Sequence, residues 1–137
     1  MGAEISTPKQ ANTPVLETKP STIFERKTSQ LTEVHSKKLW KTRFHASKNT
    51  NTLVVIDFTA SWCGPCKLME PTIKDCAAKF TDIEFFKIDV DMLGDVAEEF
   101  EVDAMPTIVL MKNGEELDRV VGAKPGELLQ KIEKHRV

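Results

Sequence analysis

From residue 31 onward, short apolar runs alternate with longer segments of helical periodicity. The runs have the length and composition of strands, expected at 31–34, 53–58, 83–89, 108–111 and 117–121. Apolar residues three and four positions apart predict helices at 36–48, 63–80, 95–100 and from 125 onward. Asn113-Gly114 is a strong signal for a hairpin between the last two strands. The order β-α-β-α-β-α-β-β-α therefore predicts an α/β protein with a mixed five-stranded sheet flanked by four helices.

The segment 63–80 carries the clearest helical pattern. Its apolar side chains recur at i, i+4, i+7 and i+11, as Met69, Ile73, Cys76 and Phe80. This spacing predicts one buried stripe along the helix. Because Cys76 falls on the stripe, we interpret it as a small buried hydrophobe without a redox role.

Asp57 is the exception within the most apolar of the predicted strands, 53–58. An ionised carboxylate is rarely buried without a partner because its desolvation costs several kcal/mol. Asp57 is therefore either hydrated at the end of the strand or buried for a functional reason.

Residues 1–29 differ from the rest of the chain. Three prolines interrupt any helical period and the apolar residues are scattered singly, so we expect a flexible arm in front of a domain at 30–137. Gly2 and Ser6 fit the pattern for N-myristoylation, with a chance match as the open alternative. A single acyl chain would give only weak, reversible membrane association.

Composition excludes several classes of protein. The chain has 137 residues and a formal net charge of −2, so no overall basic excess points to nucleic acid or an anionic membrane. The longest apolar runs, such as 53–56, are too short to span a bilayer, and residues 1–30 contain no apolar signal segment. Three cysteines with one close pair favour a reduced compartment and a reactive dithiol over a disulfide scaffold.

The close pair belongs to Trp62-Cys63-Gly64-Pro65-Cys66, at a predicted strand-to-helix junction. A helix N-terminus favours a thiolate, and Cys63 stands there, with Gly64 and Pro65 suited to the first turn. Cys66 follows one turn later, close enough to attack a mixed disulfide on Cys63. A structural zinc site would need further Cys or His ligands at suitable spacing, so we expect no metal.

This motif and several other segments resemble the thioredoxins from about residue 31 to the C-terminus. The matching segments are Asp57-Phe58, Trp62-Cys63-Gly64-Pro65-Cys66-Lys67, Pro71, Lys87-Ile88-Asp89-Val90-Asp91, Met105-Pro106-Thr107 and Val121-Gly122-Ala123. With its N-terminal arm, the chain looks like the plant h type, which is usually cytosolic. The resemblance implies the thioredoxin fold and a thiol–disulfide oxidoreductase that reduces disulfides in target proteins, in electron transport and cell redox homeostasis.

The resemblance also implies a role for each catalytic residue. Cys63 would be the attacking thiol and Cys66 the resolving thiol. Asp57 would be a buried carboxylate that helps to deprotonate Cys66, with Lys87 nearby as its partner. This role would explain a carboxylate within an apolar strand.

A substrate-binding surface is implied in the same way. Pro106 would be a cis-proline facing the dithiol, and the backbone of Met105 would pair with the backbone of the substrate. The apolar rim that receives a partner protein would consist of Trp62, Val90, Val121, Gly122 and Ala123.

Two departures from the family pattern bear on partner choice. Thr59 stands where many thioredoxins carry a second tryptophan, and Ser61 replaces a residue that is often charged. Neither change removes a catalytic group. Two alternatives stay open: a glutathione- or glutaredoxin-linked redox protein, which the Gly64-Pro65 pair disfavours, and an adaptor in which the dithiol is incidental.

The resemblance implies partners as well as chemistry. No bound cofactor is expected; the redox-active disulfide Cys63–Cys66 would receive electrons from NADPH through a thioredoxin reductase, with glutathione as the alternative reductant. We expect a cytoplasmic monomer that acts on disulfide-bearing proteins and associates with membranes only if Gly2 is acylated.

Overall fold

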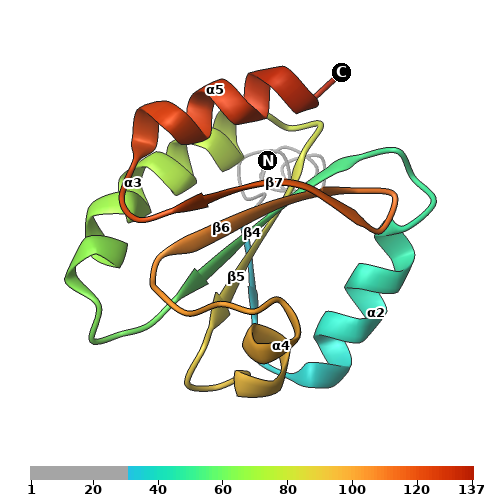
Figure 1. The fold of residues 1–137 in the computed structure, drawn as a ribbon. Coiled ribbons are helices and arrows are strands. Elements are labelled where there is room, and N and C mark those ends of the chain that lie inside the picture. The colour runs from blue at the N-terminus through green and yellow to red at the C-terminus, as the bar shows by residue number, and fades with distance from the viewer. Residues whose placement is uncertain (1–30) are drawn as a thin grey trace, which may run out of the picture.

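A five-stranded sheet forms the centre of the computed structural model, which describes residues 31–137. The strands are β3 (Leu31–Val34), β4 (Leu53–Thr59), β5 (Glu84–Asp89), β6 (Thr107–Lys112) and β7 (Glu115–Val121). Their order in the sheet is β3-β5-β4-β6-β7 (Figure 1). The first three of these neighbours run parallel, whereas β6 is antiparallel to β4 and β7 is antiparallel to β6. The predicted mixed sheet is confirmed.

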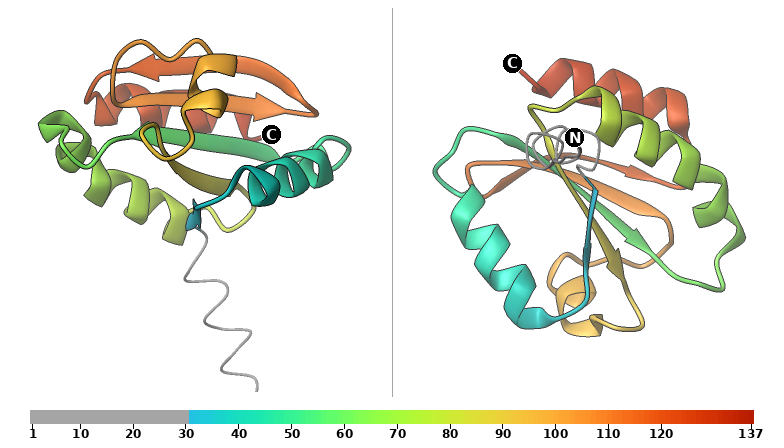
Figure 2. Two further views of the ribbon diagram at one scale, coloured as in Figure 1. Left: turned by 90° about the horizontal axis from the view of Figure 1, so that it is seen from below. Right: turned by 180° about the vertical axis from the view of Figure 1, so that it is seen from behind.

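Helices cover both faces of this sheet. They are α2 (Lys37–Ser47), α3 (Gly64–Lys79), α4 (Gly94–Glu99) and α5 (Pro125–His135). α3 and α5 lie on one face, and α2 and α4 lie on the other (Figure 2). A hydrophobic cluster joins each pair of helices to its face of the sheet. Because β4 is covered on both sides, all seven of its residues are buried. The described residues thus have the predicted α/β architecture with four flanking helices.

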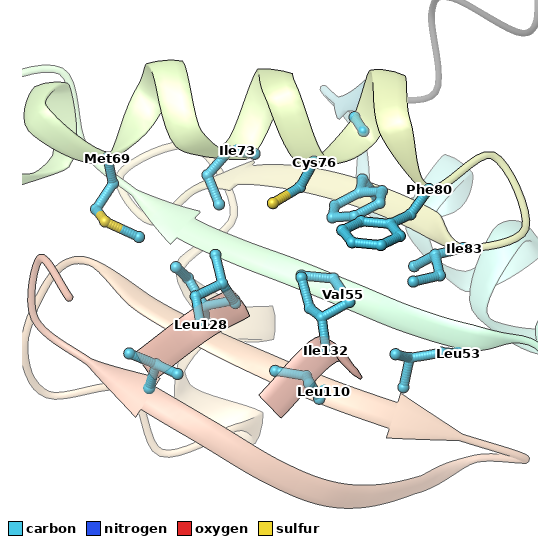
Figure 3. Packing of buried hydrophobic residues seen from close by; sticks show 14 residues of the cluster. Leu53, Val55, Met69, Ile73, Cys76, Phe80, Ile83, Leu110, Leu128 and Ile132 are labelled. Atoms are coloured by element: carbon cyan, nitrogen blue, oxygen red, sulfur yellow. The ribbon is translucent and has the colours of Figure 1, made fainter. Parts of the chain in front are cut away.

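The apolar stripe of α3 packs onto the sheet as its spacing predicts. Met69, Ile73, Cys76 and Phe80 are each no more than 2% exposed and point toward Val55 and the residues of α5 (Figure 3). Cys76 is a free cysteine in this stripe, and burial raises the pKa of its thiol. These contacts fix the direction in which α3 leaves β4.

Aromatic side chains fill the opposite face of the sheet. Trp40 of α2 meets Phe86 of β5 edge-on with ring centroids 5.8 Å apart, and Phe100 in the same manner at 6.0 Å. Ser36 begins α2 by accepting a hydrogen bond on its side chain from the backbone N–H of Leu39 at 3.0 Å.

The predicted hairpin joins β6 and β7 through Asn113 and Gly114. Both residues have positive φ, 54° and 83°, which is the backbone conformation of a two-residue type I′ connection. The strand expected from residue 117 begins earlier, at Glu115, because Lys112 and Glu115 pair directly across the turn. Charged residues on the exposed face concealed this extension from the apolar pattern.

The predicted arm at 1–29 and the lipidation candidate Gly2 lie outside the described residues. No helix within residues 31–137 has the length and apolar character needed to cross a membrane.

Candidate functional site

The two cysteines of the motif lie where β4 is followed by α3. Cys63 is the N-cap residue of α3, and Cys66 lies in its first turn. They form a disulfide, with their Cα atoms 5.3 Å apart. The backbone N–H of Cys66 donates to Cys63 Sγ at 3.1 Å. The predicted placement of the pair at a helix N-terminus is therefore confirmed.

Helix position distinguishes the two sulfur atoms, since their burial does not. Cys63 and Cys66 are each 4% exposed. The Cys63 sulfur occupies the N-cap position, where a helix N–H and the positive end of the helix dipole favour negative charge. The arrangement can therefore support a thiolate on Cys63. Gly64 and Pro65, both exposed, complete the first turn, as the motif predicts.

A loop before β6 brings Met105 and Pro106 against the disulfide. The peptide bond between them is cis, as the resemblance implied. The carbonyl oxygen of Met105 lies 3.6 Å from Cys63 Sγ. The Pro106 carbonyl accepts a hydrogen bond of 2.8 Å from the N–H of Gly122, which has a φ of 98° and follows β7. The Met105–Pro106 loop thus contacts the Cys63 sulfur and is itself held by the segment that follows β7.

The apolar rim expected around the dithiol has different degrees of exposure. Trp62 is 65% exposed and Val121 is 44% exposed, whereas Val90, Gly122 and Ala123 are half-buried. Val90 and Met105 pack against the two cysteines. Pro106, expected to face a substrate, is buried in this oxidised structure.

Asp91 contributes to this rim and has no role in the sequence-based prediction. Its Oδ2 atom accepts a hydrogen bond of 2.8 Å from the indole Nε1–H of Trp62. Asp91 is the second residue after the end of β5, and β4 and β5 are parallel neighbours, so both loops leave the same edge of the sheet. This adjacency is the signal that could have identified Asp91.

Asp57 is buried within β4, at 5% exposure. Its Oδ1 atom has no hydrogen-bond partner among residues 31–137. Burial raises the pKa of this carboxyl to about 7; the positive charge of Lys87 opposes the rise and the negative charge of Glu70 adds to it. Of the two alternatives for Asp57, burial is therefore the observed one.

Lys87 lies beside Asp57, because the two residues are register partners across β5 and β4. Its Nζ atom, however, donates to Glu70 Oε2 of α3 at 3.0 Å. This hydrogen bond raises the pKa of Lys87 and lowers that of Glu70. The expected proximity of Lys87 to Asp57 is present, but the ion pair it forms is with Glu70, which the sequence-based prediction missed.

A cleft of about 320 Å³ opens beside Cys66. Cys66, Glu70 and Lys87 line it together with residues at the carboxyl ends of β3, β4 and β5. The carboxylate–lysine pair therefore faces a space that reaches one of the two cysteines.

The dithiol at the start of α3 is placed for thiol–disulfide exchange, because one sulfur lies at a helix N-terminus and the other lies one turn away at bonding distance. The Thioredoxin family model matches residues 32–134, and the chain belongs to the thioredoxin family. That range contains every predicted site residue except Gly2.

Plant thioredoxins of the h type are among its relatives. The chain is 48% identical to Thioredoxin H8 of Arabidopsis thaliana, over 98% of this chain and 97% of that protein. It is 49% identical to Thioredoxin H2-1 of Oryza sativa subsp. japonica, over 96% and 90%. The crystal structure of thioredoxin NaTrxh from Nicotiana alata is 56% identical with a TM-score of 0.78, covering 80% of this chain and 95% of that one. The predicted resemblance is confirmed, and the chain is a thiol–disulfide oxidoreductase.

Proposed function

We propose that this thioredoxin reduces disulfides of target proteins with Cys63 as the attacking residue and Cys66 as the resolving residue. The observation that carries the proposal is the position of Cys63 Sγ, which accepts a helix N–H at 3.1 Å and lies 3.6 Å from the Met105 carbonyl oxygen. A helix N-terminus lowers the free energy of a thiolate there.

Reduction proceeds by two exchanges. The Cys63 thiolate attacks a target disulfide, forms a Cys63–target bond and releases one target thiolate. Asp57 then takes the proton of the Cys66 thiol, and the Cys66 sulfur attacks Cys63 Sγ. The Cys63–Cys66 bond forms, the second target sulfur leaves and takes up a proton, and two electrons have passed to the target.

We assign target binding to the loop and rim around the Cys63 sulfur. The backbone of Met105, held by the cis bond to Pro106, lies next to the reacting sulfur and offers hydrogen-bonding groups to an extended target segment. The exposed indole of Trp62 and the side chain of Val121, with Val90, Gly122 and Ala123, would supply apolar contacts.

We further propose NADPH, through a thioredoxin reductase, as the source of electrons for the disulfide. The family needs no bound cofactor of its own. We place the protein in the cytoplasm as a monomer made of an N-terminal arm (1–29) and a thioredoxin domain (30–137), with membrane contact only through an acylated Gly2. A coupled assay that offers either NADPH with thioredoxin reductase or glutathione with glutathione reductase tests the reductant; faster turnover with glutathione would overturn this assignment.

Trapping of mixed disulfides tests the roles of the two cysteines. Cys66→Ser incubated with oxidised insulin should accumulate a covalent adduct on Cys63 and lose turnover, because no resolving thiol is left. Cys63→Ser should form no adduct, and Cys76→Ser, which alters the buried third cysteine, should retain activity. Adducts on Cys66 in Cys63→Ser would reverse the assignment.

A further inference from the structure

The ion pair between Glu70 and Lys87 carries an inference that rests on the proposed role of Asp57. Lys87 is the register partner of Asp57, yet its Nζ atom contacts Glu70 Oε2 at 3.0 Å. Asp57 Oδ1, in contrast, has no partner among the described residues. We propose that Glu70 is a positioning residue for the resolving step, because it holds the ammonium group of Lys87 in the cleft and withholds it from the carboxylate of Asp57.

Hydration explains why Lys87 pairs with the carboxylate on the helix. The side chains of Lys87 and Glu70 are 23% and 41% exposed, so both ions keep part of their water. Asp57 is 5% exposed, and an ion pair with it would require the ammonium group to lose that water. Glu70 therefore offers Lys87 a partner at a lower desolvation cost.

The charged groups around Asp57 come from three elements. Lys87 on β5 and Glu70 on α3 act on it directly, and Cys66 on α3 lines the same cleft. On β3, Glu33 is the register partner of Lys87 and adds negative charge next to that lysine. On β6, the register partner of Asp57 is the uncharged Ile108. The remaining titratable residues that line the cleft are His35, Lys67 and Asp89.

This arrangement suits the proton transfer assigned to Asp57. The pKa of Asp57 is about 7 because burial dominates, and the charge of Glu70 contributes to the rise. A general base is most effective when its pKa lies near the pH of the reaction. If Lys87 paired with Asp57 instead, the carboxylate would be a weaker base for the proton of Cys66.

Two substitutions of opposite sign test the proposal by carboxyl ¹³C NMR titration of Asp57 in the oxidised full-length protein. Glu70→Gln releases Lys87 and should move the Asp57 titration to lower pH, by about half to one pH unit. Lys87→Met removes the cation and should move it to higher pH. Glu127→Gln is the matched control, since Glu127 also lies 3.0 Å from a lysine, Lys131, but on α5. It should leave the Asp57 titration unchanged.

A single-turnover reaction with Ellman's reagent measures the resolving step itself. The first equivalent of thionitrobenzoate reports attack by Cys63, and the second reports resolution by Cys66. In Glu70→Gln, the pH profile of the second release should shift to lower pH. Its rate should be about threefold or more above wild type on the acidic limb, where more of Asp57 is ionised, and below wild type on the plateau, where Asp57 is the weaker base. The first release should not change.

The two readouts separate the inference from the proposed function. An Asp57 titration in Glu70→Gln that is unchanged, or moves to higher pH, overturns the inference. If the Asp57 titration shifts in Glu70→Gln but the pH profile of the second release does not, the positioning role of Glu70 is overturned. If Asp57→Asn resolves as fast as wild type, the proposed role of Asp57 fails, while the titration still decides whether Glu70 controls the charge of Asp57.

Discussion

Two lysines in the described structure each lie near an aspartate and a glutamate, and the pKa values of the two aspartates shift in opposite directions. Between β7 and α5, Lys131 reaches both of its partners, since Nζ is 3.0 Å from Asp118 Oδ1 and 3.0 Å from Glu127 Oε2. In the cleft beside the disulfide, Lys87 reaches only the carboxylate on α3, and Asp57 Oδ1 is left without a partner among residues 31–137.

The pKa values of the two aspartates show what this difference does. Partial burial raises the pKa of Asp118, but hydrogen bonds from Lys131 and His135 outweigh this effect, so the net shift is downward. Deeper burial without such bonds brings the pKa of Asp57 to about 7. The same residue types therefore make a stabilising surface network in one region and a proton acceptor in the other, depending on hydration and hydrogen bonding.

The largest expected effect is a loss of stability with rising pH that originates from Asp57. In the unfolded chain this group ionises near 3.8, and in the folded protein near 7. Between these values the folded state holds a proton that the unfolded state has lost, so the free energy of unfolding falls as pH rises, by about 4 kcal/mol in total, and levels off above pH 7.

Urea unfolding of the wild type and Asp57→Asn across pH 4 to 8 measures this effect. The variant should lack this component of the pH dependence and be no less stable than wild type at pH 8. If the free energy of unfolding changed with pH by the same amount in both proteins, a buried Asp57 with a raised pKa would be contradicted.

Asp57→Asn should also slow the resolving step by about a hundredfold at pH 7, because general-base assistance to Cys66 is lost. The second release of thionitrobenzoate measures this rate, and the first release serves as an internal control. Equal slowing of both releases would mean that the substitution disturbs the dithiol as a whole.

Asp118→Asn should have the opposite and smaller effect on stability. Its folded pKa is lowered, so its contribution is present at neutral pH and is lost as pH falls through the folded value. At pH 7 the free energy of unfolding of the variant should be about 1 kcal/mol below that of wild type, since a partly exposed ion pair such as Asp118–Lys131 contributes little more. The difference from wild type should shrink as the pH falls below 3.8, the ordinary pKa of aspartate, while insulin reduction stays unchanged; a difference that stays undiminished in acid would indicate lost packing.

Glu127→Gln should give the smallest loss of stability. The free energy of unfolding should fall by about 0.4 kcal/mol, because Glu127 and Lys131 form an i,i+4 pair on a helix surface. Thermal unfolding at low and high salt measures it, and high salt should reduce the difference between variant and wild type. A loss of stability that does not depend on salt would show that the charge of Glu127 does not stabilise α5.

The parts of the site that sequence could predict depend on neighbours along the chain. The stripe from Met69 to Phe80 follows from helical periodicity, and the N-cap position of Cys63 follows from a strand-to-helix junction. These two features need only local pattern and the order of the elements. The proximity of Lys87 to Asp57, in contrast, was implied by the resemblance to the thioredoxins, and the register of β4 and β5 accounts for it.

The missed contacts join residues that are distant along the chain. Glu70 and Lys87 are 17 positions apart, and the Trp62 indole meets Asp91 across 29 positions. In addition, whether Lys87 pairs with Asp57 or with Glu70 depends on how well each carboxylate is hydrated. Composition and spacing contain no measure of that hydration, which only the packing of α3 over the sheet determines.

The buried third cysteine, Cys76, can report how often the packing between α3 and the sheet opens. Cys76 is 2% exposed between α3 and the sheet, so an alkylating reagent reaches its sulfur only when that packing separates. In the reduced protein, Cys63 and Cys66 can be blocked first under native conditions. The subsequent labelling rate of Cys76 then counts opening events, and comparison across the variants above shows which charges keep α3 closed on the sheet.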